Sequence, residues 1–203
     1  MKKIIFILLL LGLMMVPLTA KKLPDAPTSE SRTIQSRHTG FRKAIWGEAA
    51  IVCRQLEGQP DIDNETDVYA FKTTIDGINC VAMYRFTDGK LSSGAYVFAS
   101  MDDGDWNRQY TAIRRYVTNE TGLLPEEKKD YSDLVMPADK YSGNETHLLK
   151  KGLLTFTCLW YTKDTRIILY VFAENGKVHM RLRYYPKYGI PKRFDQTRSL
   201  TAS

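Results

Sequence analysis

Cysteine is scarce in this chain, with three residues among 203. Three thiols are too few for a disulfide-stapled scaffold or for a zinc site built from four thiolates. Long apolar runs are also scarce: the only one that approaches membrane length lies at the extreme N-terminus, which excludes a protein with several membrane spans. A hydrophobic content of 43% and a charged content of 26% exclude a disordered or collagen-like chain. A globular protein remains.

The first 20 residues have the layout of a secretory signal peptide. Lys2 and Lys3 precede an apolar run from Ile4 to Val16, which is shorter than the roughly 20 residues of a membrane-spanning helix. We expect cleavage after Ala20, with an uncleaved N-terminal anchor as the alternative. The pattern predicts a bacterial periplasmic or secreted protein without a membrane span after signal removal. Because no Cys lies near the cleavage site, the protein is not expected to be a lipoprotein.

The rest of the chain divides by composition. Residues 21–40 are rich in Ser, Thr, Pro and charge without an apolar period, which predicts a disordered spacer. Residues 41–186 are expected to form one domain, and residues 187–203 a basic tail. Loss of the two N-terminal lysines lowers the formal net charge from +6 to +4, which is too modest for a dedicated nucleic-acid binder.

Apolar periodicity predicts the same order of elements in two halves of the domain, 41–100 and 101–186. Each half is expected to hold one helix and then three strands, over 48–57, 68–75, 78–86 and 91–98 in the first and 106–119, 153–162, 166–173 and 177–185 in the second. Asp76-Gly77, Asp88-Gly89 and Asn175-Gly176 are typical of hairpin turns, because both positions favour positive φ. Leu123 to Gly143 is expected to be a long, partly irregular connection, and Glu145 to Lys151 a further turn of helix.

The two halves also share a local pattern. Tyr84-Arg-Phe86 before Asp88-Gly89 parallels Tyr170-Val-Phe172 before Asn175-Gly176. A three-stranded antiparallel sheet with one apolar face is not stable alone in water. We therefore predict an α+β fold: a tandem αβββ repeat whose strands join edge to edge into one antiparallel sheet, covered on one face by two helices.

Spaced residues across 41–185 carry a resemblance. They are Phe41-Arg42, Trp46-Gly47 at a helix entrance, Pro60, Tyr84-x-Phe86, Asp88-Gly89-Lys90-Leu91 and Tyr96-x-Phe98. The arrangement resembles uncharacterised bacterial exported proteins that are similar, at fold level, to beta-lactamase inhibitory protein and to small outer-membrane assembly lipoproteins. The resemblance implies binding of other proteins and no catalysis. The chain lacks the lipidation Cys of the lipoproteins.

The three cysteines fall on expected inward faces. In an oxidising compartment one pair could bond, and we favour Cys80 with Cys158 because both lie in strands of the joined sheet. The alternative is that Cys53, Cys80 and Cys158 are all buried free thiols that pack as small hydrophobes. No His is brought near a Cys by the sequence, so a catalytic thiolate is not expected.

Candidate metal and catalytic residues are few. Asp102-Asp103-Gly104-Asp105 could supply oxygen ligands to calcium, but the spacing is not that of an EF-hand loop. Capping of the following helix by Asp105 is the simpler interpretation. The three His have no metal-ligand spacing, and no catalytic motif is present. We therefore assign no catalytic residue, no metal and no cofactor.

The last strand carries the candidate partner-binding residues: Lys177, His179, Arg181, Arg183 and Tyr185. The first four alternate with apolar residues, which predicts a strand with one buried and one solvated face. The simpler interpretation is a merely solvated face. The functional interpretation is a surface for a protein or an anionic envelope component.

The sequence thus favours a non-enzymatic exported binding protein that acts through a sheet face or edge on a macromolecular partner. Two alternatives are an envelope hydrolase with a site assembled from distant residues and a carrier of a small apolar ligand between sheet and helices. The oligomeric state is open.

Overall fold

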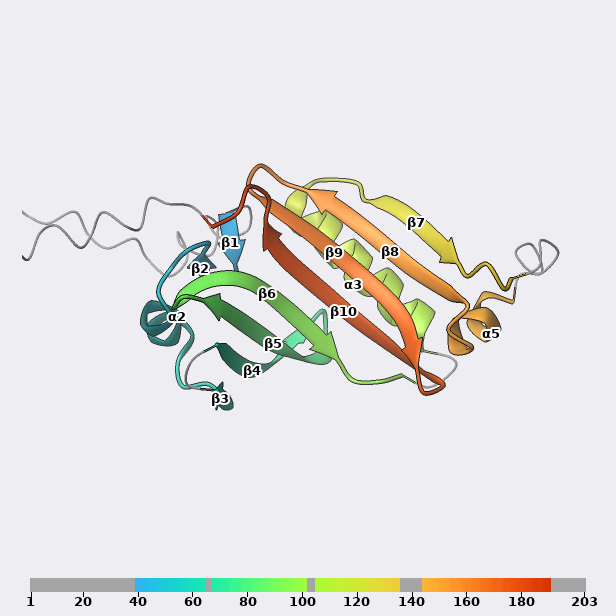
Figure 1. Ribbon diagram of the computed structural model, residues 1–203, viewed down its shortest axis with the longest axis horizontal. Helices are drawn as coiled ribbons and strands as arrows, with labels where there is room; N and C mark the ends of the chain where they lie inside the picture. The colour runs from blue at the N-terminus through green and yellow to red at the C-terminus, as the bar shows by residue number, and fades with distance from the viewer. Residues whose placement is uncertain (1–38, 65–66, 102–104, 136–143, 191–203) are drawn as a thin grey trace, which may run out of the picture.

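The computed structural model describes residues 39–64, 67–101, 105–135 and 144–190 (Figure 1). Eight antiparallel strands form one sheet in the order β3-β4-β5-β6-β10-β9-β8-β7, which confirms an α+β fold with a large antiparallel sheet. The expected signal peptide, residues 21–38 of the expected spacer and residues 191–203 of the expected tail lie outside the described residues.

The helices and strands follow one another along the chain in a fixed order. They are β1 (Gly40–Phe41), β2 (Ala44–Ile45), α2 (Ala50–Glu57), β3 (Ile62–Asn64), β4 (Val68–Ile75), β5 (Ile78–Thr87), β6 (Lys90–Phe98), α3 (Trp106–Thr121), β7 (Glu126–Tyr131), α5 (Glu145–Lys150), β8 (Leu154–Tyr161), β9 (Thr165–Glu174) and β10 (Lys177–Pro186). The short strands β1 and β2 form a separate two-stranded sheet.

Tight turns build two three-stranded meanders. Asp76, Asp88 and Asn175 each have φ near +50°, and each precedes a Gly with positive φ, as the Asp-Gly and Asn-Gly pairs predict. The meander β4-β5-β6 meets the meander β8-β9-β10 where β6 pairs with β10. In that junction Arg181 lies opposite Val97 and Arg183 lies opposite Ala95.

The strand β7 was not predicted. It lies within the expected irregular connection and pairs with β8 at one edge of the sheet. Its sequence, Glu-Glu-Lys-Lys-Asp-Tyr, has no apolar alternation, so periodicity carries no signal for it. Backbone hydrogen bonds hold this strand, and its charges are typical of an exposed edge that resists further pairing.

Helices and the N-terminal segment cover one face of the sheet. The helix predicted over 106–119 is present as α3, and its Trp106, Tyr110, Ile113 and Val117 form a buried apolar stripe. Figure 1 shows α3 running behind β8, β9 and β10. One core unites residues from α2, α3, α5 and eight of the strands, β1, β2, β4, β5, β6, β8, β9 and β10. This face is therefore covered, whereas the opposite face has no such cover among the described residues.

The expected cap at Asp105 is only partly present. Asp105 is the N-cap residue of α3, but its side chain makes no capping hydrogen bond. Its carboxylate instead accepts a hydrogen bond of 3.0 Å from Arg108. The reason is local geometry, because Asp105 has a helical backbone conformation and a capping side chain needs an extended one.

Candidate functional site

Strand alternation divides β10 into two faces. Val178, Met180 and Leu182 are buried in the core, while the intervening residues project to the opposite side, which we call the open face. All five candidate binding residues, Lys177, His179, Arg181, Arg183 and Tyr185, occupy open-face positions. The structure therefore brings the five together on one surface.

The open face of the first meander completes this surface, and the sequence analysis missed its contribution. Val81 and Val97 lie in register with Arg181, and Met83 and Ala95 lie in register with Arg183. A hollow of about 560 Å³ lies over this junction, and Arg181, Arg183 and Tyr185 line it. These apolar residues could not be assigned to the site from sequence, because only the β6–β10 pairing places them beside β10.

Aromatic rings extend the open face on the other side of β10. Tyr170 stacks on Phe172 with ring centroids 5.2 Å apart, and Phe172 stacks on His179 at 5.5 Å. The Arg181 guanidinium lies over the Phe172 ring at 5.0 Å. Such cation–π contacts orient an arginine while leaving its donors free to bind a partner.

Basic residues predominate on the open face except at the edge strand β7, where Glu126 and Asp130 also take open-face positions. On β4, β5, β6, β8, β9 and β10, which the structure describes in full, the one acidic residue at an open-face position is Glu174, beside the β9–β10 turn. Basic residues stand at several of these positions: Lys72, Arg85, Arg166, Lys177, Arg181 and Arg183. The open face therefore combines aliphatic side chains with arginine and tyrosine, two residue types that are enriched in protein-binding hot spots.

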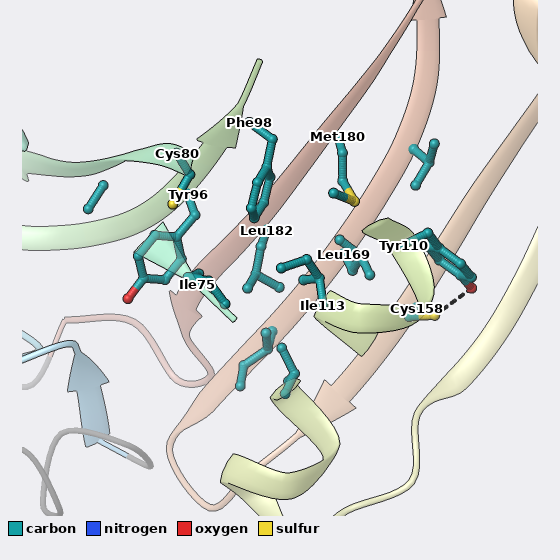
Figure 2. Packing of buried hydrophobic residues seen from close by; sticks show 14 of the residues in the cluster. Ile75, Cys80, Tyr96, Phe98, Tyr110, Ile113, Cys158, Leu169, Met180 and Leu182 are labelled. Carbon is teal, nitrogen blue, oxygen red and sulfur yellow. Dashed lines mark hydrogen bonds between the residues drawn. The ribbon is translucent and has the colours of Figure 1, made fainter. Parts of the chain in front are cut away.

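The expected disulfide between Cys80 and Cys158 is not formed, since all three cysteines are buried free thiols. Cys80 lies in β5 and Cys158 in β8, with β6, β10 and β9 between them. Neighbouring strands are about 4.8 Å apart, so the two Cα atoms are separated by far more than the roughly 7 Å that a disulfide can bridge. Cys158 instead lies 2.9 Å from the Tyr110 hydroxyl (Figure 2).

The buried thiols predict a loss of stability at alkaline pH. Burial raises the pKa of Cys80 to about 11, from an ordinary value near 9, and it also raises the pKa of Cys53. At a pH between the ordinary and the raised pKa of a thiol, the unfolded chain has released a proton that the folded chain keeps. The free energy of unfolding therefore falls as pH rises through this range. Urea unfolding at pH 8 and at about pH 10.5 should show a lower midpoint at the higher pH. An unchanged midpoint would contradict this expectation.

Neither a metal-binding cluster nor a helix able to span a membrane is found in the part of the chain that the structure describes. Within the four described ranges no group of His, Cys, Asp and Glu side chains is arranged to hold a metal ion. The Asp102-Asp103-Gly104 segment of the calcium hypothesis lies outside these ranges. Among the described helices, none has both the length and the apolar character needed to cross a membrane.

Comparisons with protein-family models, with curated proteins and with solved structures found no match to this chain.

Proposed function

We propose that the protein is a non-enzymatic binding protein, exported to the periplasm or secreted, that holds a macromolecular partner on the open face of its sheet. The observation that carries this proposal is the junction of β6 and β10. There Arg181 and Arg183 flank a hollow of about 560 Å³ with a partly apolar lining. An uncovered sheet face with anchoring arginines and apolar side chains is a surface suited to a protein partner.

The chemistry of the face favours an acidic protein as the partner. Arginine binds carboxylates through two parallel hydrogen bonds, whereas the aromatic and aliphatic residues beside it need an apolar counterpart. Tyr170, Phe172 and Tyr185 supply rigid rings around the basic residues. A polyanion without apolar groups would leave these rings and the Val81–Val97 pair unused.

The proposal also covers the origin of the two meanders as a repeat. We infer that the two meanders descend from a tandem αβββ repeat in which α2 covers the first half and α3 the second. The matching turns at Asp88-Gly89 and Asn175-Gly176 support this, as does the meeting of the halves at β6 and β10. The hollow then lies at the joint between the two repeats, where neither half alone could form it.

Charge reversal of Arg181 and Arg183 together tests the binding surface. The tagged full chain should capture an acidic protein from the envelope or medium of its source cells, and the captured protein can be identified and purified. The double variant R181E/R183E should bind that protein at least about 100-fold more weakly, because two arginines in contact with carboxylates become repulsive. Calorimetric titration of the purified pair measures the change.

A matched control tests whether the loss of binding comes from the open face or only from the change in net charge. K151E/K163E makes the same change of charge at two exposed turn residues away from the hollow, and it should bind nearly as well as the original chain. Urea unfolding should show all three proteins equally folded. Equal affinity of R181E/R183E and the original chain would remove the open face as the binding surface.

A further inference from the structure

A second cavity lies on the covered side of the sheet, independent of the open face. It has a volume of about 290 Å³ and lies between the turn after β1, the last turns of α3 and the sheet. Its apolar lining comes from Phe41, Ile75, Tyr96, Val117, Ile167 and Tyr184. This volume is near the lower limit for small-molecule sites, and it suits a ligand of about ten non-hydrogen atoms.

Arg42 enters this cavity with an incompletely satisfied guanidinium. Its Nη2 atom forms an ion pair of 3.0 Å with Glu57, and its side chain is 22% exposed. Its Nη1 atom is buried and has no hydrogen-bond partner in the protein. A buried donor without an acceptor costs free energy, so an oxygen acceptor in the cavity would stabilise this arrangement.

Two tyrosines offer further donors at the same place. The Tyr96 and Tyr184 rings line the cavity and pack on Phe41 at 5.0 and 5.2 Å. Figure 2 shows the Tyr96 hydroxyl directed away from the cluster around Leu182 and Phe98. Burial raises the pKa of both tyrosines, so both hydroxyls keep their protons and can donate hydrogen bonds.

Acidic groups near the cavity limit the charge of a ligand. Glu120 contributes to its wall, and Glu57 accepts the ion pair from Arg42. Lys43 also lines the cavity, and its ammonium lies 3.9 Å from Glu57. Two basic and two acidic side chains thus balance one another around the cavity, and this balance favours a ligand of low charge whose single carboxylate Arg42 can bind. The cavity thus favours a monoanion with an apolar body.

We propose that this cavity binds a small organic monocarboxylate. Its carboxylate accepts hydrogen bonds from Arg42 and from the Tyr96 hydroxyl, and its apolar body lies against Phe41, Ile167 and Tyr184. This site is separate from the proposed partner surface, because none of its lining residues carries a candidate binding group of the open face. The R181E/R183E variant should therefore retain carboxylate binding even if partner binding proves wrong.

Calorimetric titration of the full chain with phenylacetate tests the proposal, with phenylacetamide as the uncharged equivalent. Phenylacetate should bind at one site, and phenylacetamide at least about tenfold more weakly, because charge-assisted hydrogen bonds are roughly twice as strong as neutral ones. R42Q should weaken phenylacetate binding about tenfold or more. R108Q makes the same change at a well-exposed arginine and should leave the affinity unchanged.

Two further variants keep the test decisive if R42Q folds poorly. E120Q removes a nearby negative charge and should tighten phenylacetate binding a few-fold, whereas Y96F removes a donor and should weaken it a few-fold. Binding that fails to saturate at millimolar phenylacetate would overturn the proposal. Equal affinity for phenylacetamide would do so too, as would unchanged affinity in both E120Q and Y96F.

Discussion

Replacing Glu57 with Ala should lower the free energy of unfolding by about 3 to 5 kcal/mol. The Glu57 side chain is 1% exposed and forms an ion pair of 3.0 Å with Arg42. It also accepts hydrogen bonds from the Tyr84 hydroxyl at 2.5 Å and from the Lys43 backbone N–H at 3.3 Å. These contacts fasten the end of α2 to the turn after β1 and to β5, so the substitution leaves several buried donors without their acceptor.

Urea unfolding followed by circular dichroism measures this loss. Glu126→Ala is the matched control, because Glu126 is an exposed residue of the edge strand β7 and its loss should change stability by less than about 0.5 kcal/mol. Equal stability of the two variants would show that the Glu57 contacts do not hold the N-terminal segment in place.

Trp46→Ala should have an effect of similar size, about 3 to 5 kcal/mol. Trp46 is 1% exposed, and its indole N–H donates a hydrogen bond of 2.8 Å to the buried Thr165 hydroxyl. Thr165 begins β9, so this contact ties the N-terminal segment to the far meander across 119 residues of chain. The substitution opens a cavity and also removes the donor to Thr165.

Trp46→Phe separates the two contributions. It removes the hydrogen bond but keeps an aromatic ring in the core, so its loss should be about 1 to 3 kcal/mol, less than that of Trp46→Ala. Leu124→Ala serves as the control, since Leu124 is 86% exposed and its truncation should be nearly neutral. If Trp46→Ala were as stable as Leu124→Ala, the N-terminal segment would not belong to the core.

Much of the strand content followed from sequence, because its cause is local. Alternation over Ile78 to Phe86 and over Lys177 to Tyr185 places apolar side chains on one face, and the structure has those strands. The turns at Asp88-Gly89 and Asn175-Gly176 require positive φ, which few other residue pairs adopt readily. The helix α3 was predicted over 106–119 for the same kind of reason, because its apolar residues recur at helical spacing.

The features that the sequence did not predict depend on contacts between segments that are distant along the chain. Strand β7 is held by its pairing with β8, and its own side chains give no sign of it. The hollow needs Val97 beside Arg181, which only the β6–β10 register provides. The cavity near Arg42 likewise combines β1, α3 and β10, and the separation of Cys80 from Cys158 follows from strand order alone.

Site-specific photo-crosslinking in the source cells tests the central claim most directly. A benzophenone side chain at Tyr170, a partly buried residue of the open face, should crosslink to one acidic protein. The adduct should disappear when R181E/R183E is introduced into the same chain. The same side chain at Leu124, outside the open face, should give no such adduct. Adducts to a partner from Leu124 but not from Tyr170 would contradict the account.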